Sequence, residues 1–167
     1  MRKERDCVKA FVQLARIAEI ITLGVVITTM TLVVKGWEVL PEYIYAPFGS
    51  IEGRWVDIGS KTMLLWMMLG MFFVYLLLSV FMRFHRLYSY PVRIRPANRQ
   101  NQQLLLKSFF SLLKLELTTI LAYSIFSILM CTIRRYCLWA DAWLIALVFL
   151  ILSATVGIYL FLARRYK

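Results

Sequence analysis

Apolar residues gather into four long runs along the chain, and charged residues fall mainly between these runs. The runs cover residues 17–34, 62–82, 115–133 and 139–163. At 1.5 Å per residue, a helix of about 20 residues crosses a hydrocarbon layer of ~30 Å. The pattern therefore predicts an all-α fold, an integral membrane four-helix bundle in which residues 1–167 form a single domain.

Basic residues predict how this bundle is oriented. Residues 83–114 contain arginines and lysines but no acid, and the first acid after them is Glu116. Because loops rich in Lys and Arg stay in the cytoplasm, we predict that this loop and both chain ends lie inside. Residues 36–61 then form the outer loop. The short turn at Arg134 and Arg135 also lies outside, because a tight hairpin between the last two spans leaves it no other place.

The approach to the third span has an amphipathic pattern. Apolar residues from Ala97 onward repeat near a period of 3.6, and polar residues occupy the other faces. The apolar set is Leu104, Leu105, Phe109, Leu112 and Leu113, and the polar set is Gln100, Gln103, Lys107, Ser111 and Lys114. We predict a helical lead that rides along or into the cytoplasmic interface before it becomes the third span at Leu115.

Composition supports a membrane protein and suggests its partners. The chain is 61% hydrophobic, compared with about 45–50% in soluble domains. Its net charge of +11 lies in the connections and not on a soluble basic face, so nucleic acid is not an expected partner. Anionic lipid attracts juxtamembrane cations at about 1 kcal/mol each. We predict that lipid or an acidic protein binds the cytoplasmic residues Arg83, Arg86, Arg93, Arg95, Arg99 and Lys107.

The outer loop combines aromatic residues with a few charges, and two interpretations stay open. Trp37, Tyr43, Tyr45 and Trp55 suit a compact cap at the membrane interface. Aromatic residues beside charges are also typical of binding surfaces. In that case an extracytoplasmic ligand or a partner would meet Glu52, Arg54, Trp55, Asp57 and Lys61.

Two acids fall within or beside the spans. Arg16 and Glu19 lie three residues apart on one helical face and predict an ion pair at the inner edge. Alternatively, Glu19 is a buried acid in a proton or ligand path. Glu116 lies near Lys114 and is expected to approach Glu19 or Arg16 from the neighbouring helix.

Candidate chemistry beyond these acids is sparse. Cys131 and Cys137 flank the last outer turn, where they either form a disulfide or stay free and packed; Cys7 is expected to be cytoplasmic and reduced. His85 is the single histidine and lacks partners at metal-ligand spacing. The chain has no phosphate loop and no histidine beside a nucleophile. We therefore predict a protein that is not an enzyme, with no metal and no cofactor.

Two stretches resemble a bacterial SdpI-like membrane family, a domain of unknown function shared with toxin-immunity and signalling proteins. They are LPEYIYAPFGSIEGRWVDIGSK from Leu40 to Lys61, and YPVRIRPANRQNQQLLLKSFFSLLKLE from Tyr90 to Glu116. Where the family has an outer-loop histidine, this chain has Pro47, Phe48 and Gly49. The resemblance implies a multi-pass protein of the bacterial cytoplasmic membrane that senses or neutralises an extracytoplasmic peptide.

Three functions follow as hypotheses. The first is a binding, signalling or immunity-type module that uses the outer loop and the basic loop. The second is an accessory structural subunit, which packs against a membrane protein partner or forms a homo-oligomer. The third is a small transporter component, with Glu19 and Glu116 in a polar path.

Overall fold

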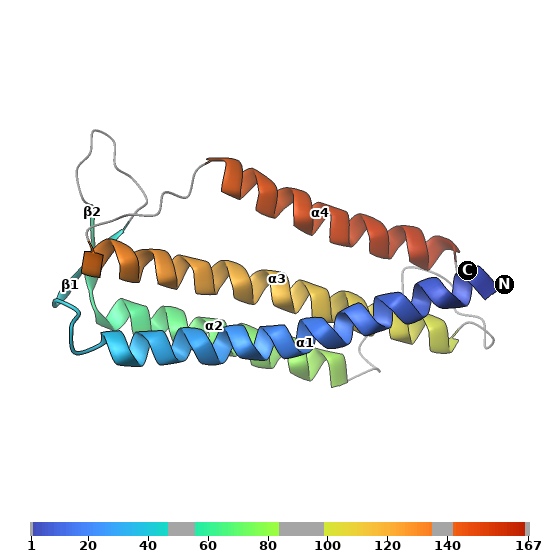
Figure 1. The fold of residues 1–167 in the computed structure, drawn as a ribbon, viewed down its shortest axis with the longest axis horizontal. Helices are drawn as coiled ribbons and strands as arrows, with labels where there is room; N and C mark the ends of the chain where they lie inside the picture. The colour runs from blue at the N-terminus through green and yellow to red at the C-terminus, as the bar shows by residue number, and fades with distance from the viewer. Residues whose placement is uncertain (1, 47–55, 84–98, 135–141, 166–167) are drawn as a thin grey trace.

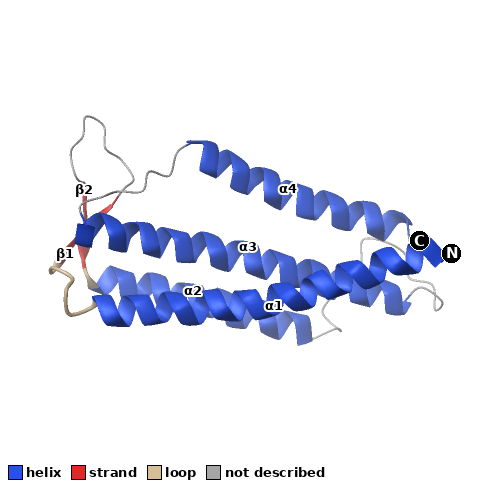
Figure 2. Cartoon of the chain, in the orientation of Figure 1, coloured by secondary structure: helices blue, strands red, loops and turns tan. Residues whose placement is uncertain are grey.

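The computed structural model describes residues 2–46, 56–83, 99–134 and 142–165. In these ranges it contains four long helices and a β-hairpin (Figures 1 and 2). The helices are α1 (Arg2–Gly36), α2 (Thr62–Arg83), α3 (Arg99–Arg134) and α4 (Ala142–Arg165), and the strands are β1 (Tyr43–Ala46) and β2 (Val56–Ser60). All four helices are long and apolar enough to cross a membrane, which confirms the predicted four-helix bundle of a multi-pass membrane protein.

The spans of the described helices differ from the predicted ones mainly in α3. Their apolar parts are Phe11–Gly36, Thr62–Arg83, Gln102–Ile133 and Ala146–Arg164. The third helix is continuous from Arg99, so the predicted interfacial lead is the first part of the spanning helix itself. Lys107, which the sequence analysis placed on the polar face of the helical lead, lies on this helix. The predicted start of the fourth span at Trp139 lies outside the described residues.

Helix α3 is the centre of the bundle, and it packs against α1, α2, α4 and the first strand. The first helix begins and the last helix ends at the same end of the bundle, while the hairpin lies at the opposite end (Figure 1). We call these the basic end and the hairpin end. Four crossings with both chain ends on one side of a membrane require this arrangement.

The hairpin closes one end of the bundle, and the sequence did not predict it. Its antiparallel strands pair Tyr43 with Ser60 and Ala46 with Val56, with a shift of register after Ile44. Gly59 has a φ of 128°, a backbone conformation that favours glycine. Ile44 has no exposed surface and belongs to the main core cluster. The described part of the outer loop is therefore packed onto the helices.

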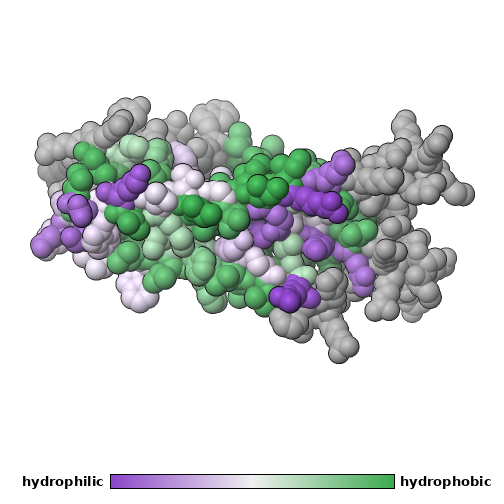
Figure 3. All heavy atoms as spheres, turned by 60° about the horizontal axis from the view of Figure 1, so that its bottom comes forward, coloured by the Kyte–Doolittle hydropathy of each residue, from purple (hydrophilic) through white to green (hydrophobic). Residues whose placement is uncertain are grey.

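Hydrophobic side chains cover the middle of the molecule, and hydrophilic ones lie toward both ends (Figure 3). Ile20 and Trp66 are 73% and 72% exposed, which suits contact with lipid tails. Small polar side chains such as Thr22, Thr118 and Ser127 are instead fully buried. The bundle thus has an apolar outside and a partly polar inside, as a membrane environment favours.

The core can be tested by truncating one buried side chain. Ile125 has no exposed surface and packs in the main cluster, whereas Ile158 is 51% exposed. Lipid is as apolar as the core, so Ile125→Ala loses mainly packing contacts, and we expect about 1–2 kcal/mol of destabilisation. Ile158→Ala should change stability by less than ~0.5 kcal/mol. Unfolding of both variants in mixed micelles measures the difference; equal effects would contradict the assigned core.

Candidate functional site

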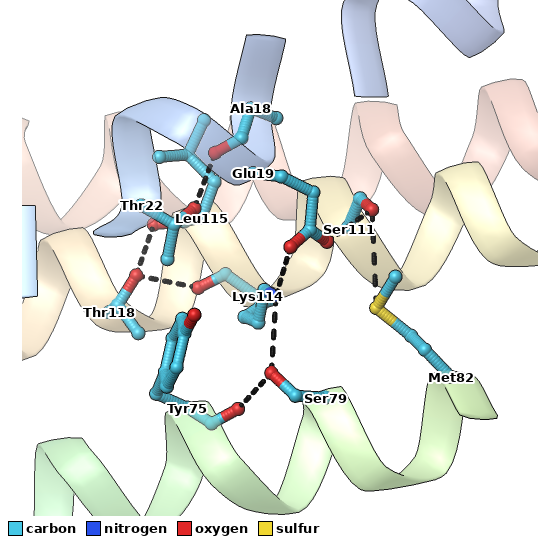
Figure 4. A network of polar contacts seen from close by, with 10 residues as sticks. All are labelled: Ala18, Glu19, Thr22, Tyr75, Ser79, Met82, Ser111, Lys114, Leu115 and Thr118. Atoms are coloured by element: carbon cyan, nitrogen blue, oxygen red, sulfur yellow. Dashed lines mark hydrogen bonds and ion pairs between the residues drawn. The ribbon is translucent and has the colours of Figure 1, made fainter. Parts of the chain in front are cut away.

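Polar side chains from three helices meet inside the bundle toward its basic end (Figure 4). Ser111, Lys114 and Thr118 on α3 are only 2%, 1% and 0% exposed. The sequence analysis placed Ser111 and Lys114 on the polar face of an interfacial helix. They do lie on a polar face, and this face is turned inward, because a helix embedded in lipid buries its polar side chains against its neighbours.

Lys114 forms the centre of this polar cluster. Its Nζ lies 2.5 Å from Oε2 of Glu19 on α1, and it donates a longer hydrogen bond of 3.3 Å to Oγ of Ser79 on α2. The ammonium also lies 4.8 Å from the ring centre of Tyr75. Ser111 donates to the other carboxylate oxygen of Glu19 at 2.6 Å. One buried cation therefore connects all three helices, and both oxygens of its counter-ion are engaged.

Glu19 pairs with Lys114. The sequence analysis had expected it to pair with Arg16 instead. The carboxylate of Glu19 points from α1 toward α3, where it keeps 35% of its side chain exposed. Arg16 stays on the exposed surface. The carboxylate gains more from Lys114 than from the exposed Arg16, because Lys114 is buried and water screens that contact less. The cross-helix pair is therefore the one that forms.

A groove of about 710 Å³ opens beside this pair at the basic end. We call it the basic groove. Four cationic residues line it together with one acid, and they are Arg16, Arg83, Lys107, Lys114 and Glu19. Ser79 and Ser108 add hydroxyl groups, and the apolar walls are Val12, Ala15, Ile20, Met82 and Leu104. Two of the predicted cytoplasmic binding residues, Arg83 and Lys107, thus meet in one place.

Glu116 lies on the other side of α3. Two residues along a helix correspond to a rotation of about 200°, so Glu116 points away from Lys114 and toward α4. There its Oε1 accepts a hydrogen bond from Thr155. Its Oε2 is buried and has no hydrogen-bond partner among the described residues. The expected approach of Glu116 to Glu19 or Arg16 does not occur, and the two acids do not share one polar path.

Most of the other predicted binding residues lie outside the described part of the chain. These are Glu52, Arg54 and Trp55 of the outer loop, and Arg86, Arg93 and Arg95 of the basic loop. Asp57 falls in the second strand and Arg99 begins α3. Lys61 places its Nζ 5.3 Å from the ring centre of Trp37, a cation–π contact that ties the hairpin to the end of α1.

The sequence analysis left open whether Cys131 and Cys137 form a disulfide, and it predicted no metal site. Cys131 is fully buried and disulfide-bonded. Cys137 lies outside the described residues, so its pairing with Cys131 stays a prediction. Within the described ranges, no three His, Cys, Asp or Glu side chains form a group that would hold a metal ion.

The chain was also compared with known proteins. No family model, no curated protein and no solved structure matches it. The function of this four-helix membrane protein must therefore be argued from its geometry. The strongest features for that argument are the buried Lys114–Glu19 pair and the basic groove beside it.

Proposed function

We propose that this protein is a non-enzymatic binding module of the bacterial cytoplasmic membrane, and that it holds an anionic amphiphile in the basic groove. One observation carries the proposal: Arg16, Arg83 and Lys107, from three different helices, line one groove that also has apolar walls. An anionic head group with an apolar tail matches both kinds of lining.

The charge balance of the groove favours an anion. Both oxygens of Glu19 are engaged by Lys114 and Ser111, so this acid is not left to neutralise Arg16 or Lys107. Arginine binds phosphate through two parallel hydrogen bonds, and lysine adds a point charge. A phosphate group at the mouth of the groove would therefore meet donors from more than one helix.

The depth of the groove favours an amphiphile over a small soluble anion. The groove reaches from Arg83, the last residue of α2, to Lys114 inside the spanning part of α3. Ile20 and Leu104 on its walls are exposed, at 73% and 37%, and would contact lipid tails. A phospholipid of the cytoplasmic leaflet would place its phosphate among the cations and its chains along these walls.

The resemblance to SdpI-like proteins supports a binding role and adds a finer hypothesis. In that hypothesis the module also signals or confers immunity, and the outer residues Glu52, Arg54 and Trp55 meet an extracytoplasmic peptide. These residues lie outside the described ranges. The basic groove is the part of the proposal that the described geometry supports directly.

Lipid binding with matched charge variants tests the proposal. Purified protein in neutral detergent is titrated with phosphatidylglycerol or phosphatidylcholine, and bound lipid is counted by native mass spectrometry. We expect Arg16→Gln and Lys107→Gln each to weaken phosphatidylglycerol binding about fivefold, as the loss of ~1 kcal/mol predicts. Added salt should weaken binding further.

Lys35 provides the control. It carries the same charge and is exposed, but it lies in the last turn of α1 at the hairpin end. Lys35→Gln should leave phosphatidylglycerol binding unchanged. If the protein binds phosphatidylcholine equally well, or if Lys35→Gln weakens binding as much as Lys107→Gln, the groove is not an anion site.

A further inference from the structure

A second groove, of about 550 Å³, lies between α3 and α4. We call it the α3–α4 groove. Its walls are mainly apolar, with Leu115, Ile120, Leu147 and Ile151 among them. Glu116 is the one charged residue among the described residues that line it. An acid in such a place is unusual, because an unpaired carboxylate in an apolar environment is costly.

Among the described residues, the close contacts between α4 and α3 lie mostly toward the basic end, and they extend as far as the hydrogen bond between Thr155 and Glu116. At the basic end the ring of Phe109 stacks on Tyr159 with 4.6 Å between ring centres, and Leu106 packs against Ala163. Gln102 adds a hydrogen bond of 3.1 Å to the backbone oxygen of Ala163. In Figure 1 α4 runs alongside α3. The groove extends along both helices toward the hairpin end, from Glu116 on α3 to Leu147 on α4.

Glu116 needs a hydrogen-bond donor that the described residues do not supply. Oε1 accepts from the hydroxyl group of Thr155, which lies on the facing helix. Oε2 is buried without a partner in the described part of the chain. A carboxylate with one satisfied and one unsatisfied oxygen would gain most from a cation that also donates a hydrogen bond.

We propose that the α3–α4 groove binds a lipophilic amine. The protonated nitrogen would donate to Oε2 of Glu116, and the apolar body would lie along Ile120 and Leu147 toward the hairpin end. An anionic phospholipid does not fit, because its net charge has the same sign as that of Glu116. A neutral lipid would leave the carboxylate without a counter-ion. This site lies on the opposite face of α3 from the basic groove and does not depend on it.

Binding of a defined amine tests the site. Dodecyldimethylamine is titrated into the purified protein in neutral-detergent micelles, and binding is followed by isothermal titration calorimetry. Glu116→Gln keeps the shape of the side chain and removes its charge, so we expect binding to weaken about tenfold or more. Ile120→Trp should also weaken binding, because it fills the groove while Glu116 stays in place.

The matched control removes an acid elsewhere. Glu38 is exposed at the hairpin end, and Glu38→Gln should bind the amine as the parent does. Partition of the amine into micelles is the same for all variants and cancels in this comparison. Amine binding that survives Glu116→Gln would overturn the proposal.

A hydrophobic carbodiimide distinguishes an amine site from a site that takes up only a proton. The protonated carboxyl group adds across one C=N bond of the reagent, and the acyl group then moves to nitrogen, so that a stable N-acylurea forms with no group lost. We expect labelling at Glu116 in the parent, none in Glu116→Gln, and protection by dodecyldimethylamine. Labelling that the amine does not reduce would show that Glu116 binds a proton alone, and would overturn the proposal.

Discussion

Replacing Glu19 with glutamine should destabilise the protein by about 3–5 kcal/mol, because it leaves a buried ammonium group without its counter-ion. Lys114 is 1% exposed, and its neighbours Ser79 and Tyr75 carry no charge that would replace the carboxylate. Lys114→Met should cost less, about 1–3 kcal/mol. In that variant Glu19 keeps its bond from Ser111 and remains 35% exposed, so it is partly solvated.

A double-mutant cycle measures the coupling of this pair. The free energy of unfolding is measured in mixed micelles for the parent, the two single variants and the variant with both substitutions. We expect the double variant to recover most of the stability lost in Glu19→Gln, because no buried charge is left unpaired. Lys107→Met, at an exposed position on the same helix, should change stability by less than ~0.5 kcal/mol.

The assigned Lys114–Glu19 pair would be contradicted if Glu19→Gln lowered stability only slightly and if the stability changes of the two single variants simply added up in the double variant. Such a result would mean that Lys114 reaches water or lipid head groups.

A second consequence separates the effect on protein stability from the effect on lipid binding. Arg16→Gln should weaken lipid binding and leave stability unchanged, because Arg16 is exposed at the groove. Glu19→Gln should lower stability, because it breaks the Lys114–Glu19 ion pair that also lines the groove.

The sequence predicted the four helices because each needs a long apolar run, and hydropathy alone reveals such runs. It did not predict which face of α3 is buried. A period of 3.6 separates an apolar face from a polar face, but it does not say which one meets the neighbouring helices. Here Ser111, Lys114 and Thr118, at spacings of three and four, form an inward face. The sequence feature that could have revealed the buried face is this stripe of polar residues, together with an acid, Glu19, in another span.

The hairpin was missed for a different reason. Tyr43 is exposed at 58% and its neighbour Ile44 is buried, as the alternation of a strand requires. However, the run is only four residues long and its tyrosines also suit a membrane interface. Its partner strand is five residues long and contains a glycine. Pairing between such short segments depends on the helices that cover Ile44, and this contact is not visible in a local pattern.

Thiol labelling of intact cells should show that the hairpin end faces outward. In a Cys7→Ser background, a cysteine in place of the exposed Glu38 should react with a membrane-impermeant maleimide added outside. A cysteine in place of Arg83, at the other end of α2, should react only after the membrane is opened. The Cys7→Ser parent, in which Cys131 is buried and disulfide-bonded, gives the background labelling.

The reason for this expectation is the unequal distribution of cations. The segment that follows Arg83 holds arginines and lysines without an acid up to Glu116, and such segments stay in the cytoplasm. The reverse labelling pattern would place the basic groove in the outer leaflet. Lys107 and Arg16 would then meet extracytoplasmic anions, so the cytoplasmic phospholipid proposed as ligand would be wrong even if the groove binds an anion.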